Sequence, residues 1–230
     1  MIEAVPRARS IRARAHRVVG NRDVSSAAFV VRLERAGFAF RPGQWINLGR
    51  AGSLQRREYT VYSPEGAEFL EVLVKEVDGG TVSRELRRCR EGDVLEVDGP
   101  NGSFCISPEE RQKKFLFVGT GTGISPFHCL ALSHAGLDYQ LLHGVRSLGE
   151  RYDHEVFDPA RLVTCVSRGS SAMGAGPVYP GRVTGYLREH PVEPTRLCYL
   201  CGNSDMIYEC YAILRSYGVP ASRIFAEVYF

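Results

Sequence analysis

The sequence predicts two domains of different fold class: an antiparallel six-stranded β-barrel over residues 1–110 and a parallel-sheet α/β domain over residues 111–230. Short β-rich runs separated by turn signals fill residues 11–98, which is typical of a small antiparallel barrel. From about Lys113, strands alternate with helices, which indicates a parallel sheet with covered faces. The polar, proline-containing stretch from Ser107 to Lys114 separates the two patterns.

The first pattern predicts six strands and one helix. The helix is expected within Gly80–Cys89, because Val82, Leu86 and Cys89 recur at helical spacing. The expected strands are Ile11–Val19, Ala27–Leu33, Gln44–Leu48, Glu58–Tyr62, Phe69–Val77 and Asp93–Val97.

The second pattern predicts five strands and three helices. The expected strands are Phe115–Val118, Tyr139–Gly144, Leu162–Val166, Leu197–Cys201 and Arg223–Val228. The expected helices are Ser125–Ala135, Arg182–Glu189 and Asp205–Tyr217.

Composition is that of a globular protein, with 44% hydrophobic and 24% charged residues among 230. No apolar run is long enough to span a bilayer, and the first ten residues lack an apolar signal-peptide core, so we expect a cytoplasmic protein. The odd count of seven cysteines argues against a disulfide framework. Cys198 and Cys201 fall on opposite faces of a strand and have no second pair nearby, so we expect no metal site.

The stretch from Arg57 to Pro64 combines a cation, an aromatic ring and a hydroxyl within a strand. Arg57, Tyr59 and Val61 would share one face, an arrangement that suits a planar, phosphorylated ligand. A half-buried strand with a surface arginine is the plainer interpretation. Gly79–Ser83 begins the expected helix of the barrel, where free N–H groups and the helix dipole favour a phosphate, although ordinary capping explains the same residues. With Arg57, this turn would hold a pyrophosphate.

Gly119–Pro126 follows a buried strand and begins a helix. An open α/β sheet binds nucleotides at such a place, in the crevice at the carboxyl ends of its strands. The run matches neither the G-x-G-x-x-G fingerprint nor a P-loop, and a simple tight turn is the alternative.

Arg146, Arg168 and Arg182 all fall at or near strand ends on the expected nucleotide side. Guanidinium groups bind a phosphate monoester in bidentate fashion, which suits a 2′-phosphate on the adenosine ribose. Ser167 occupies the position after Val166 where an acidic residue would grip a free ribose. Each arginine alone could be a surface residue, but together they favour NADP over NAD.

Two further features lie near the chain end. Cys201–Met206 repeats the strand–turn–helix design, in which Asn203 or Ser204 can cap the helix. The Cys201 thiol could touch a reacting ring, although a buried structural cysteine is more frequent. Tyr229 and Phe230 directly follow a strand, so we expect them to be docked in the core or against a flat ligand.

The net charge is +3, and arginines concentrate in two groups. These groups form either ordinary solvated faces or a docking surface for an acidic protein. Nucleic acid is a less favoured partner, because aromatic residues are not interleaved with the arginines. The groups are Arg7, Arg9, Arg12, Arg14 and Arg17, and Arg84, Arg87, Arg88 and Arg90.

In their order and spacing these motifs resemble the ferredoxin–NADP reductase family, from roughly residue 10 to the last residue. The resemblance implies FAD and NADP(H) as cofactors. The implied FAD-binding residues are Arg57, Glu58, Tyr59, Thr60, Val74, Lys75, Gly80, Thr81, Val82, Ser83, Thr122, Tyr229 and Phe230. The implied NADP-binding residues are Gly121, Thr122, Gly123, Arg146, Ser167, Arg168, Arg182, Cys201, Gly202 and Asp205.

The resemblance also implies roles in the reaction for Thr60, Cys201, Glu227 and Tyr229. Thr60 would approach the flavin N5, and Tyr59 and Tyr229 would cover opposite flavin faces. Thr60 replaces a serine common at this position, and Phe230 is an addition relative to plant-type chains, shared with some bacterial relatives. We expect Phe230 to pack on the FAD adenine.

The implied activity is hydride exchange between NADPH and FAD and single-electron exchange with ferredoxin or flavodoxin, an acidic carrier, by a monomer. A reductase component of an oxygenase and a free-flavin or quinone reductase are the alternatives within the same fold. A flavin-binding electron-transfer subunit without turnover is a further one.

Overall fold

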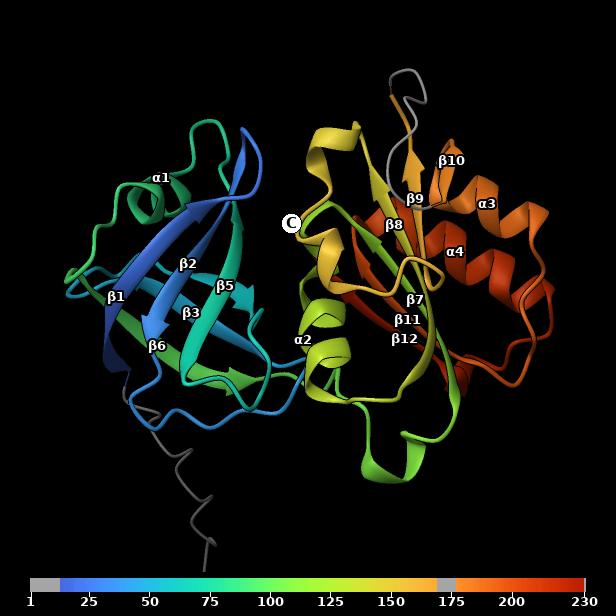
Figure 1. Ribbon diagram of the computed structural model, residues 1–230, viewed down its shortest axis with the longest axis horizontal. Coiled ribbons are helices and arrows are strands. Elements are labelled where there is room, and N and C mark those ends of the chain that lie inside the picture. Colours follow the sequence, from blue (N-terminus) through green and yellow to red (C-terminus); the bar gives the residue numbers. More distant parts are fainter. Residues whose placement is uncertain (1–12, 169–176, 230) are drawn as a thin grey trace, which may run out of the picture.

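The computed structural model describes residues 13–168 and 177–229, which form two lobes side by side, each built on one sheet (Figure 1). The predicted fold class, an antiparallel barrel followed by a parallel α/β sheet, is confirmed.

The first sheet contains six antiparallel strands in the order β4-β3-β6-β1-β2-β5. An isolated bridge between Val61 and Val72 links the β4 end of this order to β5 and closes the barrel. The strands are β1 (Arg14–Asp23), β2 (Ala28–Glu34), β3 (Trp45–Arg50), β4 (Arg57–Thr60), β5 (Phe69–Lys75) and β6 (Val94–Asn101).

Strand β4 ends at Thr60 rather than at Tyr62 as the sequence predicts. After Thr60 the backbone moves from β3 toward β5: Val61 N still donates to Gln44 O at 3.0 Å, and Tyr62 N donates to Glu71 O at 2.8 Å. The alternation of faces expected through Tyr62 therefore stops at Thr60, and Thr60, Val61 and Tyr62 are all buried.

One helix, α1 (Thr81–Arg87), covers an end of the barrel. Its buried residues Val82 and Leu86 join the barrel core with the side chains of β2, β3 and β5. Each such aliphatic side chain contributes roughly 1.5–3 kcal/mol when it is fully buried.

The second sheet contains six parallel strands in the order β10-β9-β8-β7-β11-β12. They are β7 (Lys114–Thr120), β8 (Asp138–Val145), β9 (Leu162–Val166), β10 (Val178–Pro180), β11 (Leu197–Gly202) and β12 (Ile224–Val228). Strand β10 was not predicted, because three residues ending in proline carry no detectable periodicity.

Helices cover both faces of this sheet. Helix α2 (Ser125–Ser133) packs on one face, and α3 (Val183–Glu189) and α4 (Ser204–Ser216) pack on the other (Figure 1). Cys198 and Cys201 lie in the cores on opposite faces of β11, as their spacing predicts. Short 3₁₀ helices complete the structure: η1 (Pro108–Glu110), η2 (Gly121–Ile124), η3 (Leu148–Glu150), η4 (His154–Val156) and η5 (Ala221–Arg223).

Helix α2 joins the two lobes. Its side chains bond the backbone that follows β4: His128 Nδ1 donates to Tyr62 O at 2.8 Å, and the Cys129 thiol donates to Ser63 O at 3.0 Å. The core beneath α2 also includes Val30 and Leu73 of the barrel. None of the described helices combines the length and apolar character needed to cross a membrane.

Candidate functional site

Strand β4 presents a free cation beside a partly covered ring. Arg57 is exposed, and its Nη1 donates to Arg56 O at 2.8 Å. Within residues 13–168 and 177–229 its guanidinium forms no ion pair. Tyr59 packs on the barrel core, and its burial raises the pKa of the phenol to about 12, so it stays neutral. Glu58, opposite Asn47 on β3, is exposed.

The start of α1 leaves backbone donors without a side-chain partner. Gly80 is the N-cap, and no side chain caps the helix. The Ser83 hydroxyl instead accepts a hydrogen bond from Val77 N at 3.2 Å. A Cβ at Gly80 would lie 2.9 Å from Ser83 Oγ, so this close turn favours glycine. Free N–H groups and the cation of Arg57 fit a dinucleotide phosphate.

Three predicted site residues that are far apart in the sequence, Thr60, Glu227 and Tyr229, contact one another. Tyr229 Oη donates to Thr60 Oγ1, and Thr60 Oγ1 donates to Glu227 Oε2 at 3.3 Å. The backbone fixes this arrangement, since Tyr229 N donates to Gly202 O at 2.8 Å and Glu227 pairs with Cys201 in register. The contact joins the end of β4 to the end of β12.

The acid–base properties of this cluster follow from its burial. Burial raises the pKa of Glu227 to about 7, against the hydrogen bond from Thr60, which lowers it. Burial also raises the pKa of the Cys201 thiol, with a further increase from the nearby Glu227 carboxylate. Glu227 is therefore the group of this cluster that can gain or lose a proton near neutral pH.

A cavity of about 460 Å³ opens at the carboxyl ends of β7, β8, β9 and β11. This is the edge where a parallel sheet binds nucleotides. The lining includes the predicted residues Gly121, Thr122, Arg146, Ser167, Arg182, Gly202 and Asp205, together with Lys75 and Tyr229. Gly123, Arg168 and Cys201 do not line it.

The cavity lining contains three carboxylates, Glu150, Asp205 and Glu209, and three cations, Lys75, Arg146 and Arg182. In the described part of the chain none of the three cations forms an ion pair. Glu150, also in the lining, accepts a hydrogen bond from Arg146 N at 2.9 Å and so binds the backbone of its strand end. Three cations without acidic partners fit an anionic nucleotide.

The turns after β7 and β11 fit together closely. A Cβ at Gly123 would lie 2.3 Å from Cys201 O, and one at Gly202 would lie 2.3 Å from Thr120 Oγ1. Gly123 therefore packs the two turns against each other and does not face the cavity. Asn203 N donates to Thr120 Oγ1 at 3.2 Å, and Asn203 Oδ1 caps α4 by accepting from Met206 N at 3.3 Å.

The structure also shows site residues, or locations of site residues, that the sequence did not predict. Lys75, assigned to the first cofactor from the sequence, lines the cavity of the second lobe. Thr120 and Glu150 were not predicted at all, although a hydroxyl before Gly121 and an acid four residues after Arg146 are signals visible in the chain. Val74 is fully buried in the barrel core, and Phe230 lies outside the described residues.

Comparison with known proteins gives consistent matches. The family model described as an oxidoreductase FAD-binding domain matches residues 15–106. Ferredoxin–NADP reductase B of Sorangium cellulosum is 29% identical over 93% of this chain and 96% of its own length. The toluate 1,2-dioxygenase electron transfer component of Pseudomonas putida is 27% identical over 90% of this chain, which spans 64% of that component.

A solved structure shares the whole two-lobed architecture. The ferredoxin NADP⁺ reductase of Neisseria gonorrhoeae with bound FAD and NADP superposes with a TM-score of 0.81 at 20% identity, over 95% of this chain and 99% of that one. The barrel and the parallel sheet thus agree along the chain. The chain contains an oxidoreductase FAD-binding domain, is similar to ferredoxin–NADP reductases over nearly its full length, and is an NADP-dependent flavoprotein oxidoreductase with FAD and NADP(H) as cofactors.

Proposed function

We propose that this protein is a ferredoxin– or flavodoxin–NADP oxidoreductase. It exchanges hydride between NADPH and FAD and single electrons between FAD and a small carrier protein. The observation that carries the proposal is the contact of Thr60 with Glu227 and Tyr229, which brings β4 and the end of β12 together beside the cavity that Lys75, Arg146 and Arg182 line. The similarity to the Sorangium reductase over almost the full length of both chains supports it.

In this proposal residues 1–110 form the FAD domain and residues 111–230 the NADP domain. Arg57 and the free N–H groups at the start of α1 hold the FAD pyrophosphate, and Tyr59 lies on the flavin ring. The full FAD-binding set is Arg57, Glu58, Tyr59, Thr60, Val74, Lys75, Gly80, Thr81, Val82, Ser83, Thr122, Tyr229 and Phe230.

NADP(H) would occupy the cavity. Gly121 and Thr122 would bind its pyrophosphate, and Arg146 and Arg182 would bind its 2′-phosphate. Gly123, Arg168 and Cys201 belong to the same proposed set but act from outside the lining, Gly123 by allowing the two turns to pack closely. Ser167, Gly202 and Asp205 complete the set.

FAD, when bound, supplies the conversion between two-electron and one-electron chemistry. The residues of the protein position the two cofactors and supply protons to the reaction. Thr60 Oγ1 can pass a proton that Glu227 holds, because the two groups are hydrogen-bonded at 3.3 Å. Tyr229 would cover one face of the bound flavin ring, and its side chain would have to move to admit the nicotinamide.

The decisive experiment measures electron transfer to defined carriers. Purified protein, yellow from FAD, should oxidise NADPH with ferricyanide, and then with ferredoxin or flavodoxin coupled to cytochrome c. Saturable, carrier-dependent cytochrome c reduction supports the proposal. Turnover with ferricyanide but with neither carrier at any concentration refutes it.

A second candidate is a reductase component of an oxygenase system, favoured by the similarity to the toluate 1,2-dioxygenase component. Such a protein would pass electrons to an oxygenase or to its dedicated ferredoxin and would react poorly with general ferredoxins and flavodoxins. A free-flavin or quinone reductase would instead turn over those small acceptors without any carrier. The same carrier titration separates the three activities.

The proposed carrier is acidic and the proposed enzyme a cytoplasmic monomer. Arg84, Arg88 and Arg90 are exposed and form no ion pair with the described residues, so they remain available for docking. Arg87 is engaged within the protein, by ion pairs to Asp23 and Glu76. All seven cysteines are free thiols, which suits a reducing compartment.

A further inference from the structure

Two adjacent residues of the second lobe contact different lobes of the protein. Asp153 precedes η4 in the left-handed region of backbone conformation, at a φ of 47° that non-glycine residues seldom adopt. Its side chain contacts the barrel, whereas the side chain of His154 contacts the parallel sheet. Such a backbone conformation persists only where the surrounding contacts determine it.

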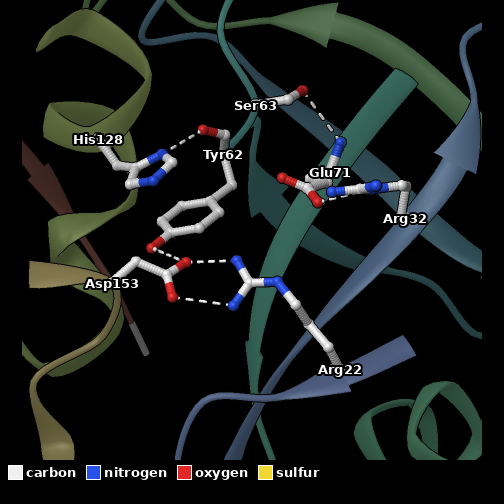
Figure 2. Close-up of polar contacts among 7 residues, drawn as sticks. All are labelled: Arg22, Arg32, Tyr62, Ser63, Glu71, His128 and Asp153. Carbon is white, nitrogen blue, oxygen red and sulfur yellow. Dashed lines mark hydrogen bonds and ion pairs between the residues drawn. The ribbon is translucent and has the colours of Figure 1, made fainter. Parts of the chain in front are cut away.

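The Asp153 carboxylate binds the barrel at two residues (Figure 2). Arg22 of β1 forms a bidentate ion pair with it, with Nη1 to Oδ1 at 2.8 Å and Nη2 on Oδ2. The Tyr62 hydroxyl donates to Oδ2 at 3.0 Å. Although burial opposes it, Arg22 holds the pKa of Asp153 below its ordinary value, so the ion pair persists at neutral pH.

Tyr62 transmits this contact to β4. Its ring stacks on His128 of α2, with centroids 3.7 Å apart and an angle of 11° between the planes. Its carbonyl accepts from His128 Nδ1, and its N–H donates to Glu71 O. These contacts hold the ring, the hydroxyl and the backbone of Tyr62. Thr60 lies only two residues before Tyr62 in the chain, so its position depends on the same contacts.

His154 leads to the nucleotide turn. His154 Nε2 lies 2.7 Å from His143 Nδ1, and His143 Nε2 lies 2.8 Å from Gly121 O. A carbonyl only accepts, so His143 must carry its proton on Nε2 and accept at Nδ1 from His154. His154 Nδ1 then accepts from Thr164 Oγ1 at 3.3 Å, and each ring nitrogen has a defined role. Burial lowers the pKa of both imidazoles, so both are neutral.

We propose that Asp153 is a positioning residue for hydride transfer. Its contacts with Arg22 and Tyr62 determine the position of the segment that carries Thr60. Its neighbour His154 determines the position of the Gly121 turn. The flavin and nicotinamide rings therefore approach each other at a separation that depends on Asp153. This inference rests on the proposed assignment of Thr60 to the flavin and of Gly121 to the nucleotide.

The barrel contains a matched control for this ion pair (Figure 2). Arg32 Nε donates to Glu71 Oε1 at 2.8 Å, and Glu71 N donates to Ser63 Oγ at 3.0 Å. Glu71, like Asp153, is a buried carboxylate paired with a half-exposed arginine. Both partners of this pair belong to the barrel, so we expect its loss to affect stability more than the placement of the two lobes.

The test compares the holoenzyme variants Asp153→Asn and Glu71→Gln by stopped-flow reduction of FAD with NADPH. We expect Asp153→Asn to lower the limiting rate about tenfold or more, because displacements of about 1 Å can cost roughly a hundredfold. The KM for NADPH should change much less, and the deuterium isotope effect with labelled NADPH should rise. Glu71→Gln should keep the limiting rate and isotope effect of the unmodified enzyme.

Tyr62→Phe is the second variant, since it removes only the hydroxyl that reaches Asp153 and keeps the stack on His128. It should lower the limiting rate in the same direction. Unchanged limiting rates in both Asp153→Asn and Tyr62→Phe overturn the inference, as does an equal loss in Glu71→Gln. The measurement needs no carrier, so failure of the carrier titration would refute only the proposed function. A Thr60→Val variant with an unchanged rate would refute the site assignment itself.

Discussion

Glu227 shows how far the surroundings alter one residue. A carboxyl group of ordinary pKa would be fully ionised at neutral pH, but burial beside Thr60 raises the pKa of Glu227 to about 7. The side chain can thus hold a proton at neutral pH within hydrogen-bonding distance of a hydroxyl. That hydroxyl is the one proposed to approach the flavin.

The pH dependence of electron transfer follows from this pKa. In the proposed reaction Glu227 would supply the proton that accompanies reduction of bound FAD, and it could do so only in its protonated form. The protonated fraction decreases as the pH rises through about 7, so the rate should fall across that interval. Stopped-flow measurements between pH 5.5 and 8.5, on the order of half-unit steps, would show the inflection. Glu227→Gln should remove it, and an unchanged profile in that variant would exclude Glu227 as the donor.

We propose that Tyr229 limits access to the cavity. Its hydroxyl bonds Thr60, and its side chain is part of the cavity lining. Displacing it costs a hydrogen bond of about 1 kcal/mol and the contacts of its ring. Tyr229→Ser should therefore bind NADP⁺ about five- to tenfold more tightly and should discriminate less between NADPH and NADH. Titration calorimetry and steady-state kinetics with both nucleotides would measure this, and unchanged values would show that Tyr229 is not a gate.

At the scale of elements, two strand–turn–helix units form the nucleotide side of the site. The turns after β7 and β11 approach each other so closely that Gly123 and Gly202 have no room for a side chain. Gly202 also has a φ of 130°, which L-residues rarely adopt. The shape of the cavity depends on this contact between turns.

Gly202→Ala should lower the free energy of unfolding by about 1–3 kcal/mol and weaken NADP⁺ binding. The added Cβ would lie 2.3 Å from Thr120 Oγ1. Gly136→Ala is the control, because Gly136 has a φ of 86° but open space around its Cβ position. Its free energy of unfolding should fall by only roughly 1–2 kcal/mol, the energetic cost of the backbone conformation. Its affinity for NADP⁺ should not change. Urea denaturation and calorimetry separate the two effects, and equal losses of affinity would contradict the packing argument.

At the scale of the whole molecule, three exposed arginines without ion pairs to the described residues, Arg84, Arg88 and Arg90, lie in and directly after α1. Helix α1 lies on the side of the barrel away from the second lobe, whereas α3 lies on the far side of that lobe (Figure 1). An acidic carrier would be steered toward the α1 end by these charges. The attraction would weaken with salt, since the Debye length shortens to about 10 Å at 0.1 M.

Reversing the charge of Arg84, Arg88 and Arg90 to Glu should raise the KM for ferredoxin severalfold at low salt. The difference from the unmodified enzyme should shrink at high salt, while FAD reduction by NADPH stays the same. Arg188→Glu on α3, where Arg188 already pairs with Glu209, is the control and should leave the KM for ferredoxin unchanged. Cytochrome c-coupled turnover at two salt concentrations would test this. A salt-independent KM would remove α1 from the docking surface.

The sequence by itself determined the fold class, because hydrophobic periodicity and turn residues act locally. Strand β9 was predicted to the residue, and the strand–turn–helix pattern placed Gly121 and Arg146 at one edge of the sheet. Two errors have a common cause. The early end of β4 and the short strand β10 depend on which strand the backbone pairs with next, and local patterns do not contain that information.

Only the tertiary structure decided how the two lobes meet. It placed Lys75 of the barrel in the cavity of the second lobe, joined Thr60 to Glu227 and Tyr229, and connected Arg22 to Asp153. These pairs are far apart in the chain, and their contacts carry no periodicity that a sequence pattern could reveal. They form because the packing of α2 against the backbone after β4 brings the lobes together, and the raised pKa of Glu227 follows from that burial.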